Sequence, residues 1–487
     1  MNIQEAKREI ANTLRAYLRK DADGKYVFPA VRQRPILLMG PPGIGKTAIM
    51  EQVAEECRVG LVAYTMTHHT RQSAIGLPHI VKKNYGGQEF MTTEYTLSEI
   101  IASVYETMER SGCREGILFL DEINCVSETL APTMLQLLQN KTFGNHRVPE
   151  GWVIVGAGNP PEYNKSVREF DVVTLDRVRQ IDVEADLKVW LDYAREARVH
   201  GAVISYLTIK NNRFYVIDQE GERQAFVTAR GWEDLSELLK SYEEAGIPFG
   251  ADQAMQFLHQ EEIARDFAAY CALYRKYGSD YGVSGLLAGD LSPAEYREKT
   301  AMAAAGDFEE RFTVVNLLLE QLQNDFCCYE REDRFVTRLH EILQQEGKVP
   351  EKPGTDEDAR VLRRLEEMRL STKEFHLHEK PAVQEHLRKL FQEDTDRREK
   401  MITDLHARLE RAFGWLAECF GEDGPEMILF VSSLTRNARA MDFIVWHGCA
   451  PYLKYSQALL FWEREEELQR ACRDLSLSGE DAQNAQK

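Results

Sequence analysis

The first third of the chain alternates short apolar runs with segments whose apolar residues lie three and four positions apart. The segments at 46–57 and 97–110 have this helical periodicity. Runs of about five or six apolar residues are typical of strands that are buried on both faces. Such runs fall at 35–39, 60–66, 116–120 and 152–157. The alternation predicts a parallel sheet with helices on both faces.

The periodicity changes after about residue 184, where strand signals become rare. Residues 228–246 have an amphipathic helical pattern that stops at Gly246, and glycine commonly ends helices. From about residue 251 nearly all of the chain is helical in period, as at 311–326 and 398–420. The loop-like stretch 347–358 interrupts this region. The second half is therefore predicted to be a helical module without a recognisable catalytic motif.

Length and charge narrow the class of protein. A chain of 487 residues is too long for one compact core, so we expect two or three domains. The formal net charge of −19 disfavours nonspecific binding to nucleic acid or to an anionic membrane.

The lack of a recognisable targeting signal and the scattered cysteines predict a cytoplasmic protein. No apolar run reaches the length of a membrane span, and the charged amphipathic segment 1–18 does not resemble a signal peptide. The nine cysteines are scattered and contain no C-x-x-C pair, which favours reduced thiols.

The segment "GPPGIGKT" fits the pattern G-x-x-x-x-G-K-[ST] and lies between a predicted strand and a predicted helix. In that setting, backbone N–H groups and the helix N-terminus surround the β- and γ-phosphates of a nucleotide. Lys46 would supply positive charge, and the Thr47 hydroxyl would hold Mg²⁺. The predicted ATP-binding residues are Gly40, Pro41, Pro42, Gly43, Ile44, Gly45, Lys46, Thr47 and Ala48.

Two carboxylates follow the strand in "ILFLDE". Asp121 is expected to complete the Mg²⁺ site with Thr47, and Glu122 to polarise the attacking water. The strand in "WVIVGAGN" ends at Asn159, whose amide could orient water near the γ-phosphate. The "GNPP" sequence around Asn159 is also simply favourable for a turn.

In combination, these motifs resemble those of the AAA+ ATPases, and more narrowly of their MoxR-like, dynein-related branch. The resemblance covers about residues 30–245 and rests on "GPPGIGKT", "LFLDEIN", "TMLQLLQNKTFG", "VIVGAGNPPEYN", "LDR" and "TAR". It implies an α/β P-loop NTPase core with a small helical lid, in subunits that assemble as a ring, usually a hexamer.

The resemblance also gives roles to two arginines. Arg177 in "LDR" corresponds to an arginine finger, which acts on the γ-phosphate of a neighbouring subunit and can contribute about 10³–10⁵ in rate. Arg230 in "TAR" corresponds to the second sensor, which reaches the phosphates of its own subunit. Valine and glycine follow these two arginines where the family more often has phenylalanine and alanine.

Two other arginines, Arg168 and Arg179, lie near Arg177 in the sequence. Half of the residues at 170–183 are apolar, and the segment reads like a strand entering the core. Within it, Arg179 is expected to be an exposed strand residue paired with Asp182 or Glu184 rather than a catalytic group. Arg168 is a further cation that could face a neighbouring subunit.

The resemblance implies two hairpins and a domain plan. The segment 68–78, followed by "GGQEFMTTEYT", looks like a hairpin inserted in the second core helix, and 141–149 looks like a second hairpin. Both would face the ring pore or a client; the alternative is that both are ordinary surface loops. The predicted domains are an N-terminal helix (1–29), the ATPase core (30–184), a lid (185–250), a helical module (251–474) and a disordered tail (475–487).

The leading functional hypothesis is Mg²⁺-dependent ATP hydrolysis that drives chaperone-like remodelling of a client protein. The resemblance implies a partner that contains a von Willebrand A-type domain. One alternative is a nucleic-acid-dependent ring ATPase, against which the acidic charge and the lack of a basic aromatic stripe count. Another is a nucleotide-binding scaffold that does not hydrolyse, against which the water-polarising Glu122 counts.

Overall fold

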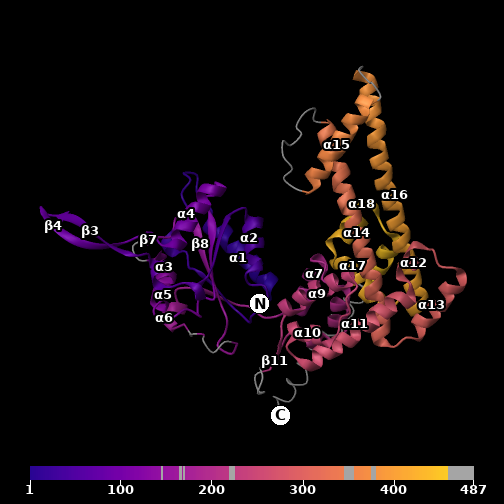
Figure 1. The fold of residues 1–487 in the computed structure, drawn as a ribbon, viewed down its shortest axis with the longest axis horizontal. Helices are drawn as coiled ribbons and strands as arrows, with labels where there is room; N and C mark the ends of the chain where they lie inside the picture. The colour runs from indigo at the N-terminus through magenta and orange to yellow at the C-terminus, as the bar shows by residue number, and fades with distance from the viewer. Residues whose placement is uncertain are drawn as a thin grey trace, which may run out of the picture. The chain divides into compact units, whose positions relative to one another are not determined.

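The structure is a computed structural model that describes residues 1–143, 146–163, 167, 170–218, 225–344, 356–374 and 380–458. Its contacts divide the chain into two units (Figure 1). The first unit comprises Met1–Tyr193 and Asn211–Ala264, and the second comprises Ala194–Lys210 and the chain from Arg265 onward. The predicted tail at 475–487 and Arg168 lie outside the described residues. The domain boundaries predicted from the motifs stay a prediction.

The first unit is built on a five-stranded sheet, and its parallel strands confirm the parallel sheet that the sequence predicted. The strands are β1 (Ile36–Met39), β2 (Gly60–Thr65), β5 (Gly116–Asp121), β8 (Trp152–Gly158) and β9 (Arg179–Asp182). They lie in the order β2-β5-β8-β1-β9, and every neighbouring pair is parallel. The predicted fold class, a P-loop NTPase core with a parallel sheet between helices, is confirmed.

Alternating side chains of the strands build one apolar layer on each face of the sheet. Ile36 and Leu38 of β1 pack with α1 (Ile3–Tyr17) and α2 (Ala48–Cys57) on one face. Leu37 packs on the other face with α3 (Arg71–Ile75), α4 (Glu99–Ser111) and α5 (Ala131–Asn140). Short 3₁₀ turns lie at η1 (Ala30–Arg32) and η2 (Met66–His68). The sheet is therefore buried on both sides, as its unbroken apolar runs require.

Residues 170–183 correct the sequence-based prediction of a strand. Asp171 caps a short helix, α6 (Val172–Leu175), by accepting a hydrogen bond from the backbone N–H of Thr174 at 2.8 Å. The strand begins only at Arg179, where β9 joins the edge of the sheet. Val172 and Val173 are apolar but 81% and 55% exposed, so their side chains do not enter the core.

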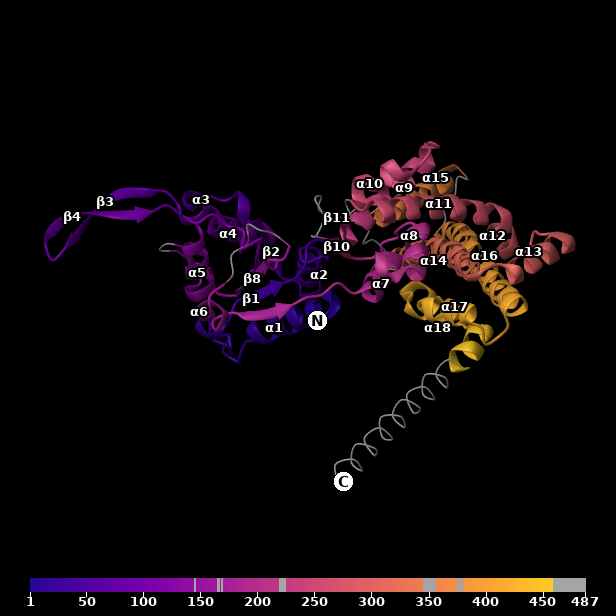
Figure 2. The same ribbon diagram turned by 90° about the horizontal axis from the view of Figure 1, so that it is seen from below.

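Two antiparallel hairpins occur in the predicted segments, although the first begins only at Pro78 and the residues before it form the short helix α3. β3 (Pro78–Tyr85) and β4 (Gln88–Tyr95) pair over their full length and project away from the rest of the first unit (Figure 2). Ile80 and Met91 on this hairpin are 72% and 70% exposed. The shorter hairpin pairs β6 (Thr142–Phe143) with β7 (His146–Arg147).

The remaining elements of the first unit are here called the lid, after the segment predicted at 185–250. It contains most of α7 (Leu187–Glu196), the turn η3 (Asn211–Arg213), α9 (Ala229–Ala245) and α10 (Ala251–Leu258). Between η3 and α9, β10 (Val216–Asp218) and β11 (Ala225–Val227) form a two-stranded antiparallel ribbon. Gly246 ends α9 in a left-handed conformation, as the sequence predicted.

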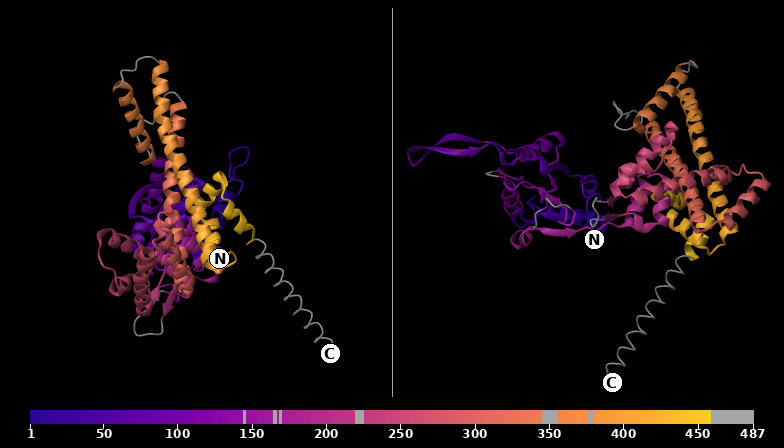
Figure 3. Two further views of the ribbon diagram at one scale, coloured as in Figure 1. Left: turned by 90° about the vertical axis from the view of Figure 1, so that its right-hand side faces the viewer. Right: turned by 60° about the horizontal axis from the view of Figure 1, so that its bottom comes forward.

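The second unit is helical. Its elements are α8 (Gly201–Ile209), most of α11 (Glu261–Tyr281), α12 (Val283–Ala288), α13 (Pro293–Ala305), α14 (Phe308–Gln344), α15 (Asp356–Glu374), α16 (Lys380–Phe420), α17 (Pro425–Arg436) and α18 (Ala438–His447). The long helices α14 and α16 run side by side (Figure 3). No described helix is both long enough and apolar enough to cross a bilayer.

Buried carboxylates tie α15 to the two long helices. Glu332 of α14 contacts Arg360 of α15, and accepts a hydrogen bond from Arg397 of α16 at 2.7 Å. Asp394 accepts from Arg364 at 2.9 Å and from Arg397 at 2.6 Å. Because each buried carboxylate meets two guanidinium groups, the cost of removing its charge from water is offset.

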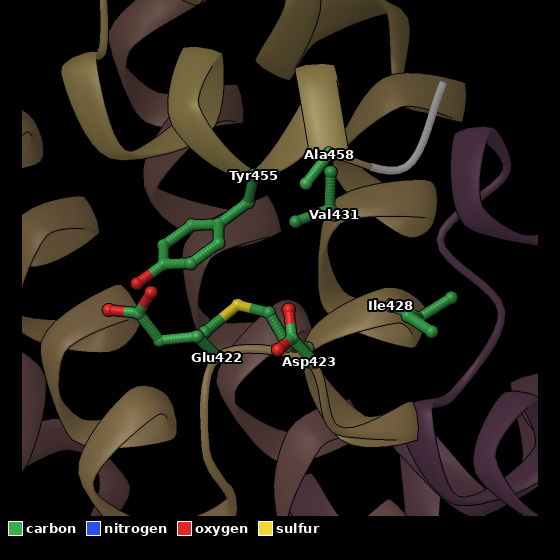
Figure 4. A pocket seen from close by; sticks show the side chains of 7 residues that line it. Glu422, Asp423, Ile428, Val431, Tyr455 and Ala458 are labelled. Atoms are coloured by element: carbon green, nitrogen blue, oxygen red, sulfur yellow. The ribbon is translucent and has the colours of Figure 1, made fainter. Parts of the chain in front are cut away.

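A small cavity lies in the second unit, near Glu422, Met427 and Tyr455 (Figure 4). Its volume of about 20 Å³ has room for a single water molecule. It is therefore too small to be a site for a nucleotide or another organic ligand.

The first prediction concerns a glycine in the core. A Cβ on Gly116 would lie 2.6 Å from ring atoms of Trp152, which is 2% exposed. Gly116→Ala should lower the free energy of unfolding of the first unit by about 1–3 kcal/mol, because the ring has no space to move. Chemical denaturation followed by tryptophan fluorescence measures this change.

Gly414→Ala is the matched control. Gly414 lies within the helix α16, and a Cβ there would meet nothing within 4 Å. This substitution should stabilise the second unit by about 0.5–1 kcal/mol through the helix preference of alanine. Equal effects of the two substitutions would contradict the packing of Trp152 against Gly116.

Candidate functional site

Most of the predicted site residues lie at one edge of the sheet. Because all five strands are parallel, the segments that follow β1, β5 and β8 leave the sheet on the same side. These segments carry the glycine-rich loop, Asp121 with Glu122, and Asn159. Crevices at the carboxyl ends of parallel strands are common ligand sites in α/β proteins. β8 lies between β5 and β1 in the sheet, so Asn159 lies between the other two segments.

The loop that joins β1 to α2 contains residues 40–47 and depends on its glycines. Gly45 has φ +92°, a left-handed conformation that other residues adopt only with strain. Gly40 is fixed by contact instead, since a Cβ there would lie 2.6 Å from the backbone oxygen of Val183. Ala48 is the first residue of α2. The loop therefore leads directly into a helix N-terminus.

Lys46 is the charged centre of this loop. Its ammonium group donates hydrogen bonds to the backbone oxygens of Gly40 and Pro41, at 2.7 and 2.8 Å, and to Oδ1 of Asn159 at 2.8 Å. The residue is only 8% exposed. Burial lowers the pKa of Lys46 to about 8, with Asp121 acting in the opposite direction and Arg230 adding repulsion. A partly desolvated cation of this kind is suited to binding phosphate.

Thr47 and Asp121 form the second pair of the site. The Thr47 hydroxyl donates to Oδ2 of Asp121 at 2.8 Å. A hydroxyl and a carboxylate are oxygen ligands of the kind that Mg²⁺ prefers, and they lie beside the phosphate loop. The residues present therefore fit a magnesium ion, which Thr47 and Asp121 would hold.

Glu122 has an unusual backbone. Its φ is +55°, which is rare for a residue other than glycine, and its N–H donates to Oδ1 of Asp121 at 2.9 Å. The hydroxyl of Thr67, just after β2, donates to Oε2 of Glu122 at 3.0 Å. Strained backbone of this type is concentrated at functional sites. Thr67 is a contact that the motifs did not indicate.

Asn159 is held by the neighbouring loop. The side chain of Asn124, which is 2% exposed, donates to the backbone oxygen of Asn159 at 2.8 Å. The same side chain fills the space where a Cβ of Gly158 would lie, at 2.6 Å. Asn124 thus fixes the end of β8, and with it the amide that contacts Lys46. Asn124 stands within the quoted "LFLDEIN", but its position alone did not identify this contact.

Arg230 reaches the loop from the lid. Its backbone N–H donates to the oxygen of Gly43 at 3.2 Å, and its charge contributes to lowering the pKa of Lys46. The guanidinium group is therefore close enough to the buried ammonium to repel it, which places positive charge from the lid beside the loop.

Arg177 is not brought to this edge. It precedes β9, whose first residue, Arg179, is paired with Ile36 at the start of β1. The phosphate loop follows Met39, which is the last residue of β1 and is paired with Asp182 at the far end of β9. Four strand residues span about 13 Å. Arg177 therefore lies at the amino-terminal edge of the sheet and is exposed there.

Arg179 has a different partner from the one predicted. It contacts the Glu9 carboxylate of α1 and donates to the Thr13 hydroxyl at 2.6 Å. The prediction of a pairing with Asp182 or Glu184 was wrong, because α1 crosses beside the edge strand and offers a carboxylate from a distant part of the sequence.

A parallel sheet with a glycine-rich loop after β1 and a carboxylate pair after β5 defines the P-loop class of nucleoside triphosphatases. Residues 35–178 match the family model of the AAA domain, dynein-related subfamily. This match supports an AAA+ ATPase, a class that binds nucleotide, typically with Mg²⁺. No curated protein matches the chain.

The pKa of Lys46 yields a prediction. In complex with a polyphosphate, the charged amine is favoured, so its pKa rises above about 8 and binding takes up a proton at higher pH. ATP affinity should therefore fall about fivefold between pH 8 and pH 9. Calorimetric titration in buffers of different ionisation enthalpy measures both the affinity and the proton uptake.

Lys46→Arg is the control for this titration, because arginine stays charged throughout that range. Any ATP binding that the variant retains should be independent of pH. An affinity that is constant from pH 7 to pH 9 in the unmodified chain would contradict the assignment of a titrating Lys46 at the phosphates.

Proposed function

We propose that the chain is a Mg²⁺-dependent ATPase that hydrolyses ATP to ADP and phosphate. The observation that carries this proposal is the convergence of Lys46, the Thr47–Asp121 pair, Glu122 and Asn159 at one edge of the sheet. Each group supplies a different requirement of phosphoryl transfer to water. A bound magnesium ion would neutralise charge on the β- and γ-phosphates.

The residues of the chain divide the reaction between them. The loop amides and Lys46 bind the phosphates, and Thr47 with Asp121 would hold the metal. Glu122 orients the attacking water and accepts its proton, and its position is restrained by Thr67. The side-chain amide of Asn159, whose backbone is held by Asn124, orients water near the γ-phosphate. Arg230 adds a positive charge from the lid.

Arg177 acts on the nucleotide of a second copy. Its place at the amino-terminal edge of the sheet separates it from the loop of its own chain. Val172 and Val173, just before it, are exposed apolar residues of the kind found in protein–protein contacts. AAA+ proteins usually oligomerise into rings, and a hexameric ring would bring Arg177 to the neighbouring nucleotide.

The client of the ATPase is proposed from the resemblance to the MoxR-like branch. By that resemblance, the ring remodels or activates a client protein together with a partner that contains a von Willebrand A-type domain. The exposed Ile80 and Met91 on the β3–β4 hairpin support a protein-contacting role for this hairpin. The second unit is proposed as the part of the chain that binds the partner.

Complementation between two variants tests this proposal. Arg177→Ala and Glu122→Gln should each lose about 10³-fold or more in turnover while still binding ATP. In mixed rings, the Arg177→Ala chain supplies an intact Glu122 and the Glu122→Gln chain supplies an intact Arg177. ATP turnover of the mixture should exceed that of either variant alone by at least about tenfold. A mixture as inactive as its components argues against action between subunits.

Arg179→Ala is the matched control, two residues from Arg177. It removes a partly exposed ion pair with Glu9, so it should lower the unfolding free energy by less than about 1 kcal/mol. ATP turnover should remain near that of the unmodified chain. If Arg179→Ala inactivated the enzyme as strongly as Arg177→Ala, the loss would reflect a disturbed edge strand rather than a missing catalytic charge.

A further inference from the structure

The lid contacts the phosphate loop through the end of its two-stranded ribbon. Val216 of β10 is paired with Val227 of β11, so the neighbouring residues Tyr215 and Thr228 emerge side by side from the same end. The Tyr215 hydroxyl donates to the backbone oxygen of Pro42 at 2.8 Å. Thr228 lies against Gly43, 3.1 Å from where a Cβ would be. None of the sequence motifs includes Tyr215.

Four successive carbonyl oxygens of the loop are held by hydrogen bonds. Lys46 holds those of Gly40 and Pro41 from within the loop. The lid holds the next two, Pro42 through the Tyr215 hydroxyl and Gly43 through the N–H of Arg230.

The direction of a carbonyl fixes the direction of the N–H in the same peptide plane, because the two are antiparallel in a trans peptide. The Gly40 and Pro41 carbonyls share their planes with the nitrogens of Pro41 and Pro42, which carry no hydrogen. The next two planes carry the N–H groups of Gly43 and Ile44. The lid therefore orients the first two amides of the loop that are able to bind an anion.

We propose that Tyr215 is a positioning residue of the nucleotide site, whose hydroxyl holds the Pro42–Gly43 peptide plane so that the Gly43 N–H faces the phosphates. This inference rests on the proposed nucleotide-binding function of the loop. Preorganised amides bind an anion better than amides that must first reorient.

The surroundings of Tyr215 fit this role. Tyr215 packs on the apolar layer that includes Ile44. The fully buried Trp232 of α9 donates from Nε1 to the backbone oxygen of Phe214 at 3.1 Å, which anchors the adjacent residue to the lid. Burial also raises the pKa of Tyr215 above its usual value, so the hydroxyl stays protonated and can donate.

Tyr215→Phe tests the proposal, because it keeps the ring and removes only the hydroxyl. Affinity for Mg²⁺·ATP should fall about three- to tenfold, the loss of one hydrogen bond to the loop. The KM for ATP should rise by the same factor while kcat changes less than about twofold, since the amide contacts phosphate in both the ground and transition states. Amide hydrogen exchange of residues 40–47 without nucleotide should become faster.

Tyr193→Phe is the matched control. The Tyr193 hydroxyl donates to Glu233 of α9 at 2.5 Å, within the lid and away from the loop. This variant should also lose one tyrosine hydrogen bond, here to a carboxylate, yet keep the ATP affinity, the KM and the exchange rates of residues 40–47. Thermal unfolding of both variants separates these local effects from a loss of stability.

The outcomes distinguish two failures. If the unmodified chain does not bind Mg²⁺·ATP, the proposed function fails, and hydrogen exchange alone decides whether Tyr215 positions the loop. If the unmodified chain binds ATP and Tyr215→Phe matches it in affinity and exchange, the role of Tyr215 is overturned and the ATPase proposal stands. Equal losses in the Tyr193 and Tyr215 variants would assign the effect to the lid as a whole.

Discussion

The parallel register of β1, β8 and β5 is the constraint on which the rest of the site depends. It places three segments that are far apart in sequence at one edge of the sheet, with β8 in the middle. Lys46 is then within hydrogen-bonding distance of Asn159, and Thr47 of Asp121. The apolar layers on both faces fix that register, since a shift by one residue would turn buried side chains to the wrong layer. The geometry of the site therefore depends on the packing of the two apolar layers.

Electrostatics adds a second constraint, because the loop has to keep a buried cation. Lys46 is partly desolvated, and three oxygens compensate the cost of its charge. Two of these oxygens precede prolines, so directing them inward sacrifices no amide that could bind an anion. The next two amides, those of Gly43 and Ile44, are oriented by the lid through Tyr215 and Arg230. The loop and the lid thus form one surface at the proposed phosphate site, although they are far apart in the sequence.

The sequence predicted the features that follow from local patterns. Unbroken apolar runs identified four of the five strands, and the spacing within "GPPGIGKT" located the loop. The prediction of a buried strand at 170–183 was wrong because apolar residues need not be buried: Asp171 caps the short helix α6, and this helix exposes Val172 and Val173. Sequence-based prediction also failed for contacts between distant segments: nothing local links Arg179 to Glu9, or Tyr215 to Pro42. Such contacts depend on how the edge strand and the lid ribbon are placed, which no motif encodes.

The edge strand β9 runs between two regions that the proposed function assigns to the active sites of neighbouring copies. At its amino end, Arg179 is tied to α1 through Glu9 and Thr13, two residues after the exposed Arg177. At its other end, the N–H of Val183 donates to the Met39 oxygen at 2.7 Å, and the Val183 oxygen leaves no space for a Cβ on Gly40. The strand therefore lies between the surface that presents Arg177 and the first residue of the phosphate loop, and contacts with α1 and with β1 hold its two ends in place.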